Sequence, residues 1–367
     1  MSAAHLTITL SSGTVITVLF GEATAQQQLE CDKFAANGRG LYLDEDEILA
    51  REAYLRKQNL IVNGGGRTWC LYRQDDQNQV LSTCKTMRRT CLLEEAESAH
   101  TLEGYCITSV YTPLVYRGHG LASHLLRKVA EWLDGPGAAS LSMLYSGIPR
   151  YYEALGWDTL PNDETILSIS PWIQDTLDSD AGLDVRSLLD ADIEELCAQE
   201  SRRHTRTGVG QEASKLYVVP TADIVRYQQA LSDHMGELWQ YEAPKIRGAA
   251  YKCDWICWYH DFGSRTLRIQ HVHKSIENEE SKEETMIALF LHAVREANNW
   301  SFTTVSTRDT SARVRTALRT LAEEGNFTKS VSEIKRAQKI SLRWKDGNAQ
   351  FGNVVMDNES YAWNLRY

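Results

Sequence analysis

The sequence lacks the cysteine and histidine patterns that would identify a metal or redox site. Its eight cysteines stand at positions 31, 70, 84, 91, 106, 197, 253 and 257, with no CxxC pair and no histidine cluster at zinc spacing near them. Scattered thiols in a chain of 367 residues are typical of reduced core residues. The sequence therefore predicts a reducing compartment and no metal ligand set.

An excess of positive charge is also absent. The formal net charge is -10 and the isoelectric point lies near 5.5. A basic field is what attracts phosphate backbones, so this balance argues against nucleic acid or an anionic membrane as a partner. A local basic pocket remains compatible with it, because a single bound phosphate group needs only a few donors.

Long apolar runs are missing as well. No stretch of eighteen apolar residues is available to span a membrane. The first residues, Met1 to Leu10, alternate polar and apolar side chains and lack the basic and apolar regions of a signal peptide. These absences predict a cytoplasmic protein.

The features that are present are those of an ordinary two-domain globular chain. Hydrophobic residues make up 43% and charged residues 24% of the sequence. A length of 367 residues is near twice the usual domain size. The composition turns polar between Pro161 and Ser179, so we expect domains at 1–175 and 176–367.

Strand and helix patterns alternate in the first half. The expected elements are a hairpin at 6–20, a helix at 45–57, strands at 67–72, 80–88 and 104–112, a helix at 121–133, a strand at 139–144 and a helix at 150–155. The polar stretch 94–102 is interpreted as a connection that frames a site entrance. This order is typical of an α+β fold.

The second half has a similar order of elements. We expect helices near 189–201, 221–235, 282–299 and 311–324, and strands near 250–260, 266–272, 300–306, 340–344 and 353–356. The likeness between the halves lies in element order and not in residues. The second half is therefore interpreted as an α+β domain, compatible with a degenerate copy of the first.

A glycine-rich turn stands between an expected strand and an expected helix. Gly118 and Gly120 remove the Cβ atoms that would block the close approach of a phosphate. The N–H groups and the dipole at the start of the helix favour an anion such as a pyrophosphate. The spacing satisfies neither the Walker pattern nor the dinucleotide fingerprint, which argues against a nucleotide triphosphatase and a Rossmann dehydrogenase.

Three motifs around this turn resemble those of the GNAT acetyltransferase superfamily. Arg117, Gly120 and Ala122 fit the pyrophosphate-binding turn [Q/R]-x-x-G-x-[G/A]. The lead-in from Val110 to Arg117 and the segment from Tyr151 to Trp157 resemble the superfamily's flanking motifs, in the same order. The resemblance implies a GNAT fold with a mostly antiparallel, splayed sheet, acetyl-CoA as cosubstrate and no metal.

The resemblance also implies roles for individual residues. A backbone N–H of Val110 or Tyr111 would polarise the thioester carbonyl. Tyr152 stands at the position of the general acid, with aromatic packing as the alternative role. The cofactor-binding residues would be Val110, Tyr111, Thr112, Arg117, Gly118, His119, Gly120, Leu121 and Ala122. His119 is interpreted as a backbone donor and not as a catalytic base.

The general base is less well indicated. An amine with a reference pKa of about 10.4 must lose a proton before it attacks. Glu103, just before the site strand, is the best-placed carboxylate by analogy with other members of the superfamily. Water is the alternative.

The whole chain also resembles the fungal L-lysine N6-acetyltransferase family. The segments 43–55, 69–72, 84–89, 144–146, 340–344 and 358–363 carry this resemblance. It implies acetylation of the N6-amine of free L-lysine, the entry to lysine breakdown, with the second domain covering the acceptor side of the site. The candidate substrate contacts are Arg88, Glu359 and Tyr361. Lys85 stands where that family has an acidic residue, which weakens the case for free lysine, and Leu121 replaces an aromatic residue.

Other functions remain open. The acceptor can be another small amine, or the enzyme can act on protein lysines or N-termini. A third hypothesis is that the protein is a CoA-binding sensor or scaffold without catalytic activity. His260, His271 and His273 lie on an expected hairpin and are interpreted as the surface of an edge strand, with a metal site as the alternative.

Overall fold

The computed structural model divides the chain into two compact units. It describes residues 6–9, 13–38, 43–95, 98–160, 163–169, 183–204, 214–275, 282–324, 328–335, 339–345 and 354–356. The first unit comprises Met1–Cys91, Thr101–Leu160 and Gln338–Gly352, and the second comprises Leu92–His100, Pro161–Ala337 and Asn353–Tyr367. No helix in these described ranges is long and apolar enough to cross a membrane.

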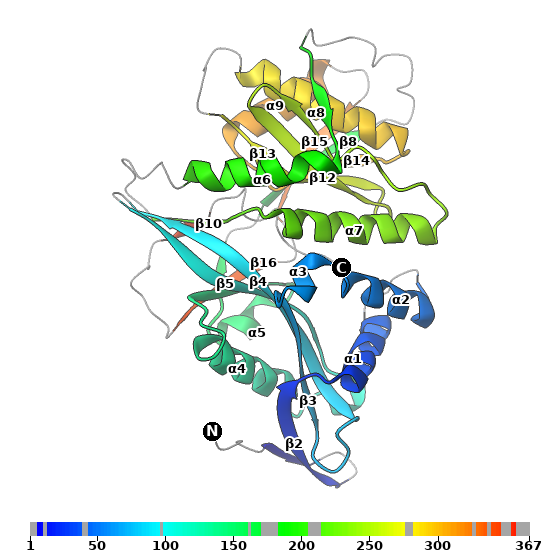
Figure 1. Ribbon diagram of the computed structural model, residues 1–367, viewed down its shortest axis with the longest axis vertical. Coiled ribbons are helices and arrows are strands. Elements are labelled where there is room, and N and C mark those ends of the chain that lie inside the picture. Colours follow the sequence, from blue (N-terminus) through cyan, green and yellow to red (C-terminus); the bar gives the residue numbers. More distant parts are fainter. Residues whose placement is uncertain are drawn as a thin grey trace. The chain divides into compact units, whose positions relative to one another are not determined.

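The first unit is built on a mixed sheet (Figure 1). Its strands are β1 (Leu6–Thr9), β2 (Val15–Glu22), β3 (Gly66–Arg73), β4 (Val80–Glu94), β5 (Ala99–Tyr111), β6 (Leu141–Ser146), β7 (Asp158–Leu160) and β16 (Lys339–Trp344). The order is β1-β2-β3-β4-β5-β6-β16-β7. The pairs β1–β2, β2–β3, β3–β4, β6–β16 and β16–β7 are antiparallel, whereas β5 and β6 are parallel.

Helices cover both faces of this sheet, with α4 (Leu121–Asp134) and α5 (Pro149–Glu153) on one side and α1 (Ala25–Gly38) and α2 (Glu45–Leu55) on the other (Figure 1). A short helix, α3 (Asn59–Val62), leads into β3. Asp44 caps α2, because its side chain accepts from the Glu47 N–H while the Glu47 carboxylate accepts from the Asp44 N–H.

The core against α4 is apolar and aromatic. The helix buries Leu121, Leu125, Leu126, Val129, Ala130 and Leu133, which recur at helical spacing. Trp69 of β3 packs between Phe20 and Trp132, with ring centroids 5.4 and 4.7 Å away. The Arg67 guanidinium lies over the Trp132 ring, 5.2 Å from its centroid. On the opposite face, a small cluster around Cys31, Cys70 and Val80 packs under α1.

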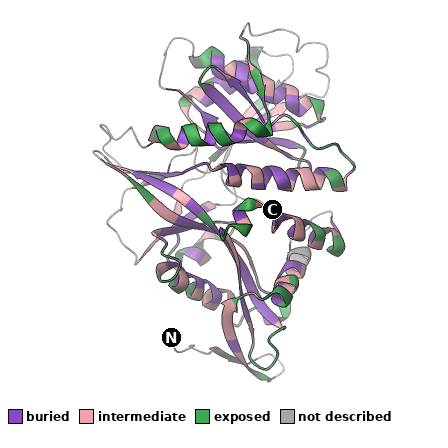
Figure 2. Ribbon diagram, viewed as in Figure 1, coloured by how far each residue is buried: buried purple, intermediate pink, exposed green. Residues whose placement is uncertain are grey.

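The second unit is a three-layer structure. Its sheet contains β8 (Asp163–Ile169), β9 (Arg186–Leu188), β11 (Gly248–Tyr251), β12 (Asp254–Asp261), β13 (Thr266–His273), β14 (Thr304–Thr307) and β15 (Thr328–Lys335). The order is β15-β8-β14-β13-β12-β11-β9. On one face lie α8 (Lys282–Asn299) and α9 (Ala312–Glu324), and on the other α6 (Asp190–His204) and α7 (Ala222–Leu238) (Figure 1). The buried core lies between the strands and the helices (Figure 2).

Two further strands, β10 (Lys215–Val218) and β17 (Val355–Met356), pair in parallel in the second unit. The mixed α+β class expected from the sequence is confirmed in both units. The division differs from the expected boundary near residue 175 in three places, because Leu92–His100 and the residues from Pro161 belong to the second unit and Gln338–Gly352 belongs to the first. β8 pairs with β14 and β15 of the second sheet, and β16 returns from the end of the chain to pair with β6 and β7 of the first.

Several local expectations were wrong. The strand expected at 250–260 is two strands paired with each other, because β11 ends at Tyr251 and β12 begins at Asp254. The stretch 94–102 is not a polar connection, because β4 continues to Glu94 and β5 begins at Ala99. The strand expected from residue 300 begins at Thr304, after a turn at Ser301. The strand that carries His271 and His273 is not an edge strand, because β13 lies between β12 and β14, and both histidines are buried.

Candidate active site

The strand β5 is irregular at Ser109, which adopts a left-handed backbone with φ of 56°. Tyr105 and Ile107 face the core under α4, and Val110 packs against that same core. This shift by one residue is the signature of a β-bulge. A strict alternation along the strand would instead place Ser109 on the same face as Ile107.

β5 separates from β6 near this bulge. The parallel register runs from Gly104 opposite Leu141 to Ile107 opposite Leu144, whereas β5 continues to Tyr111 and β6 to Ser146. Two strands that continue beyond their last pair form the splayed sheet expected from the sequence. A left-handed backbone at a residue other than glycine destabilises the folded state by on the order of 1–3 kcal/mol.

Side chains of Ser82 and Arg117 hold the end of β5 through hydrogen bonds to backbone carbonyl groups. The Ser82 hydroxyl lies 3.1 Å from the Tyr111 carbonyl and 2.8 Å from the Thr112 hydroxyl. The Arg117 Nε donates to the Thr112 carbonyl over 2.9 Å, and its guanidinium lies 5.7 Å from the Tyr111 ring centroid. Arg117 therefore braces the turn that follows the strand.

The glycine turn has the backbone that its sequence requires. Gly118 and Gly120 adopt φ of 83° and 74°, and a Cβ built on either would meet no atom within 4 Å. Gly120 is the N-cap residue of α4, so no side chain caps this helix. The first N–H groups of a helix have no partner within it. An open, left-handed turn followed by such donors fits a pyrophosphate.

Leu121 is 1% exposed and lies in the core under α4. Only its backbone can therefore face a ligand, and a packed leucine is compatible with this helix start. His119 is half-buried in the turn.

Tyr152 lies in α5, buried in the same core as α4 and β5. Burial, together with the nearby Tyr151 and Cys84, raises the pKa of Tyr152 to about 12, against a hydrogen bond with Ser146 that lowers it. The phenol is therefore protonated throughout the physiological range and can donate a hydrogen bond. The neighbouring Tyr151 hydroxyl lies 2.9 Å from the Ser123 hydroxyl, which joins α5 to the first turn of α4.

Glu103 and Arg88 form an ion pair with each other. The Arg88 Nη2 donates to Glu103 Oε2 over 2.7 Å, and Arg88 Nε donates to Oε1. Glu103 stands seven residues before Val110. At about 3.3 Å per residue, this separation is about 23 Å along the strand. If Val110 or Tyr111 binds the thioester carbonyl, Glu103 is too distant to take a proton directly from the amine.

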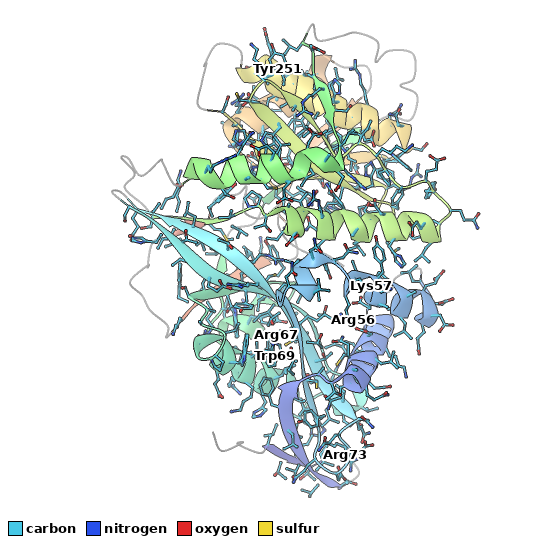
Figure 3. All side chains as sticks on the ribbon, viewed as in Figure 1. Arg56, Lys57, Arg67, Trp69, Arg73 and Tyr251 are labelled. Atoms are coloured by element: carbon cyan, nitrogen blue, oxygen red, sulfur yellow. The ribbon has the colours of Figure 1, made fainter. Side chains whose placement is uncertain are left out.

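Lys85 lies on the other face of the sheet, between two buried carboxylates. Its Nζ is 2.5 Å from Glu52 Oε2 of α2 and 3.3 Å from Asp32 Oδ1 of α1. Arg51 pairs with Glu52 at 2.7 Å, and Arg56, at the end of α2 (Figure 3), pairs with Asp32. The charge of Lys85, the residue that departs from the fungal family's pattern, is therefore balanced by two carboxylates of the protein itself.

Replacing Lys85 by methionine is expected to lower the free energy of unfolding by about 3 kcal/mol. This loss is at the lower end of the range of about 3–5 kcal/mol for removing one partner of a buried ion pair. The reason is that Glu52 and Asp32 each keep an arginine partner. Urea unfolding measures it, with Lys57→Met, at an exposed lysine close in sequence to Arg56, as the control. Equal stability of the two variants would contradict a stabilising role for Lys85.

Stability should also fall in acid as Glu52 is protonated. Burial opposes ionisation of Glu52, but Lys85 and Arg51 outweigh it and lower the pKa from 4.5 to about 2. Above pH 4.5, ionised Glu52 therefore adds about 3 kcal/mol to the free energy of unfolding. This contribution is lost as the pH falls towards 2. The difference in the free energy of unfolding between wild type and Glu52→Gln should therefore decrease between pH 4.5 and about 2. A difference that stays constant over this range would contradict the lowered pKa of Glu52.

The structure thus brings together most residues expected at the cofactor site, from Val110 to Ala122, on one strand end, one turn and one helix start. Glu359 and Tyr361, expected to contact the acceptor, lie outside the described residues. Sequence reasoning missed the bulge at Ser109 and the Ser123–Tyr151 contact, for which no local pattern gives a signal.

Comparison with known proteins places the chain in a family. Residues 171–364, just over half of the chain, match the model of the LYC1 GNAT-like C-terminal domain. The chain belongs to this family. One relative of this LYC1 GNAT-like chain is the lysine acetyltransferase of Yarrowia lipolytica (strain CLIB 122 / E 150), which is 19% identical over 277 residues, or 63% of this chain and 69% of the relative.

Solved structures share the fold of the LYC1 GNAT-like chain. The GCN5-related N-acetyltransferase from Kribbella flavida has a TM-score of 0.58 at 17% identity, covering 89% of this chain and 71% of that one. A probable N-acyltransferase from Enterococcus faecalis V583 has a TM-score of 0.53 at 12% identity, covering 90% and 73%. The expected GNAT fold is confirmed, and family membership makes the chain an acyltransferase.

Proposed function

We propose that this enzyme transfers the acetyl group of acetyl-CoA to the amine of a small molecule, with the N6-amine of free L-lysine as its first expected acceptor. Such a reaction would be an entry to lysine breakdown. The observation that carries the proposal is the strand, bulge, turn and helix start from Ser109 to Ala122, next to a buried tyrosine. The lysine acetyltransferase among its relatives favours lysine.

The residues present fit the cosubstrate. The open space at Gly118 and Gly120 and the N–H groups that begin α4 suit a pyrophosphate. Arg117 positions the turn, and β5 continues through Val110 and Tyr111 beyond its last pair with β6, where an N–H can polarise a carbonyl. Acetyl-CoA, when bound, supplies an acyl thioester that an amine can attack.

Tyr152 would act at the sulfur as a hydrogen-bond donor. With a pKa of about 12, it holds its proton more tightly than a thiol with a reference pKa near 8.5. Complete transfer to a free thiolate would be uphill by about 5 kcal/mol. Tyr152 therefore stabilises developing charge on sulfur through its O–H, and the proton that finally neutralises the thiolate comes from the amine or from solvent.

The acceptor amine must lose a proton before it attacks. Glu103 would serve only through a chain of several waters, because it is bound to Arg88 and seven residues of strand, about 23 Å, separate it from Val110. Water alone is the simpler base. The two buried carboxylates near Lys85 are occupied by that lysine and by arginines, so an incoming ammonium has to find other partners.

A cytoplasmic location is part of the proposal. All eight cysteines are free thiols, and seven of them are buried. Free thiols in such number are typical of a reducing compartment.

The test is the release of CoA thiol from acetyl-CoA, with products identified by mass spectrometry. L-lysine is compared with other amino acids, polyamines and a lysine-containing peptide. Selective formation of N6-acetyl-lysine would support the full proposal. Turnover of another small amine would contradict only the choice of lysine as the acceptor. Turnover of the peptide would contradict the proposal of a small-molecule acceptor. No turnover with any amine would favour the hypothesis of a CoA-binding sensor or scaffold without catalysis.

A further inference from the structure

Two histidines of the second unit face one buried carboxylate. His271 and His273 lie two residues apart on β13, and Glu200 lies on α6. Glu200 is 0% exposed, His271 1% and His273 8%. The His271 Nε2 is 3.5 Å from Glu200 Oε1, and the His273 Nδ1 contacts Glu200 Oε2.

The donor atoms are close enough together to share one metal ion. One nitrogen of each histidine and one oxygen of Glu200 all lie within 4.8 Å of one another. Zinc binds nitrogen and oxygen at about 2.0–2.2 Å, which places two donors at a tetrahedral angle about 3.4 Å apart. The separation of 3.5 Å between His271 and Glu200 matches that spacing.

Neighbouring side chains orient these donors. The Tyr217 hydroxyl donates to Glu200 Oε1 over 2.9 Å. The Trp255 ring stacks on His273 at 5.6 Å with an interplanar angle of 8°, and it also contacts His271 at 4.9 Å. Outer partners that fix carboxylate and imidazole ligands are a regular part of protein metal sites.

The charge of the cluster requires a cation or a proton. A buried carboxylate is costly unless it is paired. With Glu200 ionised and both imidazoles neutral, the cluster carries one negative charge in a site excluded from water. A second histidine–carboxylate pair, between His260 of β12 and Glu296 of α8, shows the simpler arrangement. Glu296 Oε1 lies 2.8 Å from both His260 Nε2 and the donor Trp300 Nε1. That pair has only one histidine.

We propose that Glu200, His271 and His273 bind a divalent transition-metal ion, with zinc as the best fit. Two imidazoles and a carboxylate suit zinc and its neighbours in the first row and do not suit magnesium or calcium. Three protein ligands leave a fourth position for water. The ion links α6 to the centre of the second sheet and stabilises this unit, a function separate from acyl transfer.

The test uses the full chain, purified without a metal-affinity tag. After dialysis against zinc and then against metal-free buffer, about one zinc ion per chain should remain by mass spectrometry of the metals. Replacement by Co²⁺ should give the visible absorption of a tetrahedral cobalt site. Zinc in excess should raise the Tm of the metal-free protein by about 5–10 °C.

Variants locate the ion. Glu200→Gln and His273→Asn should lose the bound zinc and the zinc-dependent shift in Tm, whereas His260→Asn should keep both. Retention of zinc by Glu200→Gln and His273→Asn would overturn the proposal. If these variants fail to fold, the wild-type protein still decides, because no retained zinc, no cobalt spectrum and no change in Tm would refute the site.

Discussion

Replacing Gly120 by aspartate is expected to weaken CoA binding about 10³-fold. The new carboxylate would lie at the start of α4, where the proposal places a pyrophosphate. Two like charges 4 Å apart repel by about 4 kcal/mol at the effective dielectric of a protein surface, and each 1.4 kcal/mol is a factor of ten. Aspartate tolerates the left-handed backbone of this position better than most residues, so the fold should be preserved. Titration calorimetry with CoA measures the loss.

Gly13→Asp is the matched control for this variant. Gly13 also has a left-handed backbone, with φ of 82°, and a Cβ built on it also meets no atom within 4 Å. It precedes β2 and is not part of the proposed site. The account predicts wild-type affinity for Gly13→Asp. Equal affinity of Gly120→Asp and Gly13→Asp would show that CoA does not bind at this turn.

Replacing Tyr152 by phenylalanine is expected to lower kcat about 10²-fold and to leave the KM for acetyl-CoA within about threefold. The variant keeps the buried ring and removes only the O–H that would stabilise charge on sulfur. Steady-state rates of thiol release, measured with the best acceptor, give both constants. Because the pKa of Tyr152 is raised to about 12, this residue should not cause the rate to fall between pH 8 and about 10.

Tyr105→Phe is the control for this second variant. Tyr105 is 7% exposed, close to the 8% of Tyr152, and belongs to the same core. Its hydroxyl lies 3.4 Å from the Gly137 carbonyl, away from the glycine turn. A similar decrease in kcat in both variants would indicate a general effect of the core and would remove the catalytic role of Tyr152.

The local elements around the site could be predicted because short patterns determine them. The apolar residues of α4 recur at helical spacing, and Gly118 and Gly120 indicate a turn that needs positive φ. The packing of Leu121 follows from the same periodicity.

Features that depend on distant parts of the chain could not be predicted. The return of β16 to the first sheet depends on pairing between residues about 195 apart, such as Ile340 with Tyr145, and β16 has no mark of its partner in its own sequence. The bulge at Ser109 is a property of how β5 leaves β6, and alternation alone places Ser109 on the wrong face.

The partners of the charged residues could not be predicted from the sequence either. Lys85 was noted as a departure from a family pattern, but its neutralisation by Asp32 and Glu52 depends on the packing of two helices on β4. Glu103 and Arg88 were expected to have separate roles, as base and as substrate contact, whereas adjacent strands place them in one ion pair. The carboxylate of Glu200 joins two histidines about seventy residues away, and no sequence spacing indicates this.

Hydrogen–deuterium exchange with and without acetyl-CoA tests the central claim most directly, because it locates the cosubstrate on the chain. The account predicts slower exchange in the peptide that contains residues 110–123, which holds the end of β5, the glycine turn and the first turn of α4. Peptides from the β1–β2 hairpin should be unchanged. Binding of acetyl-CoA without protection of 110–123 would contradict the proposed site.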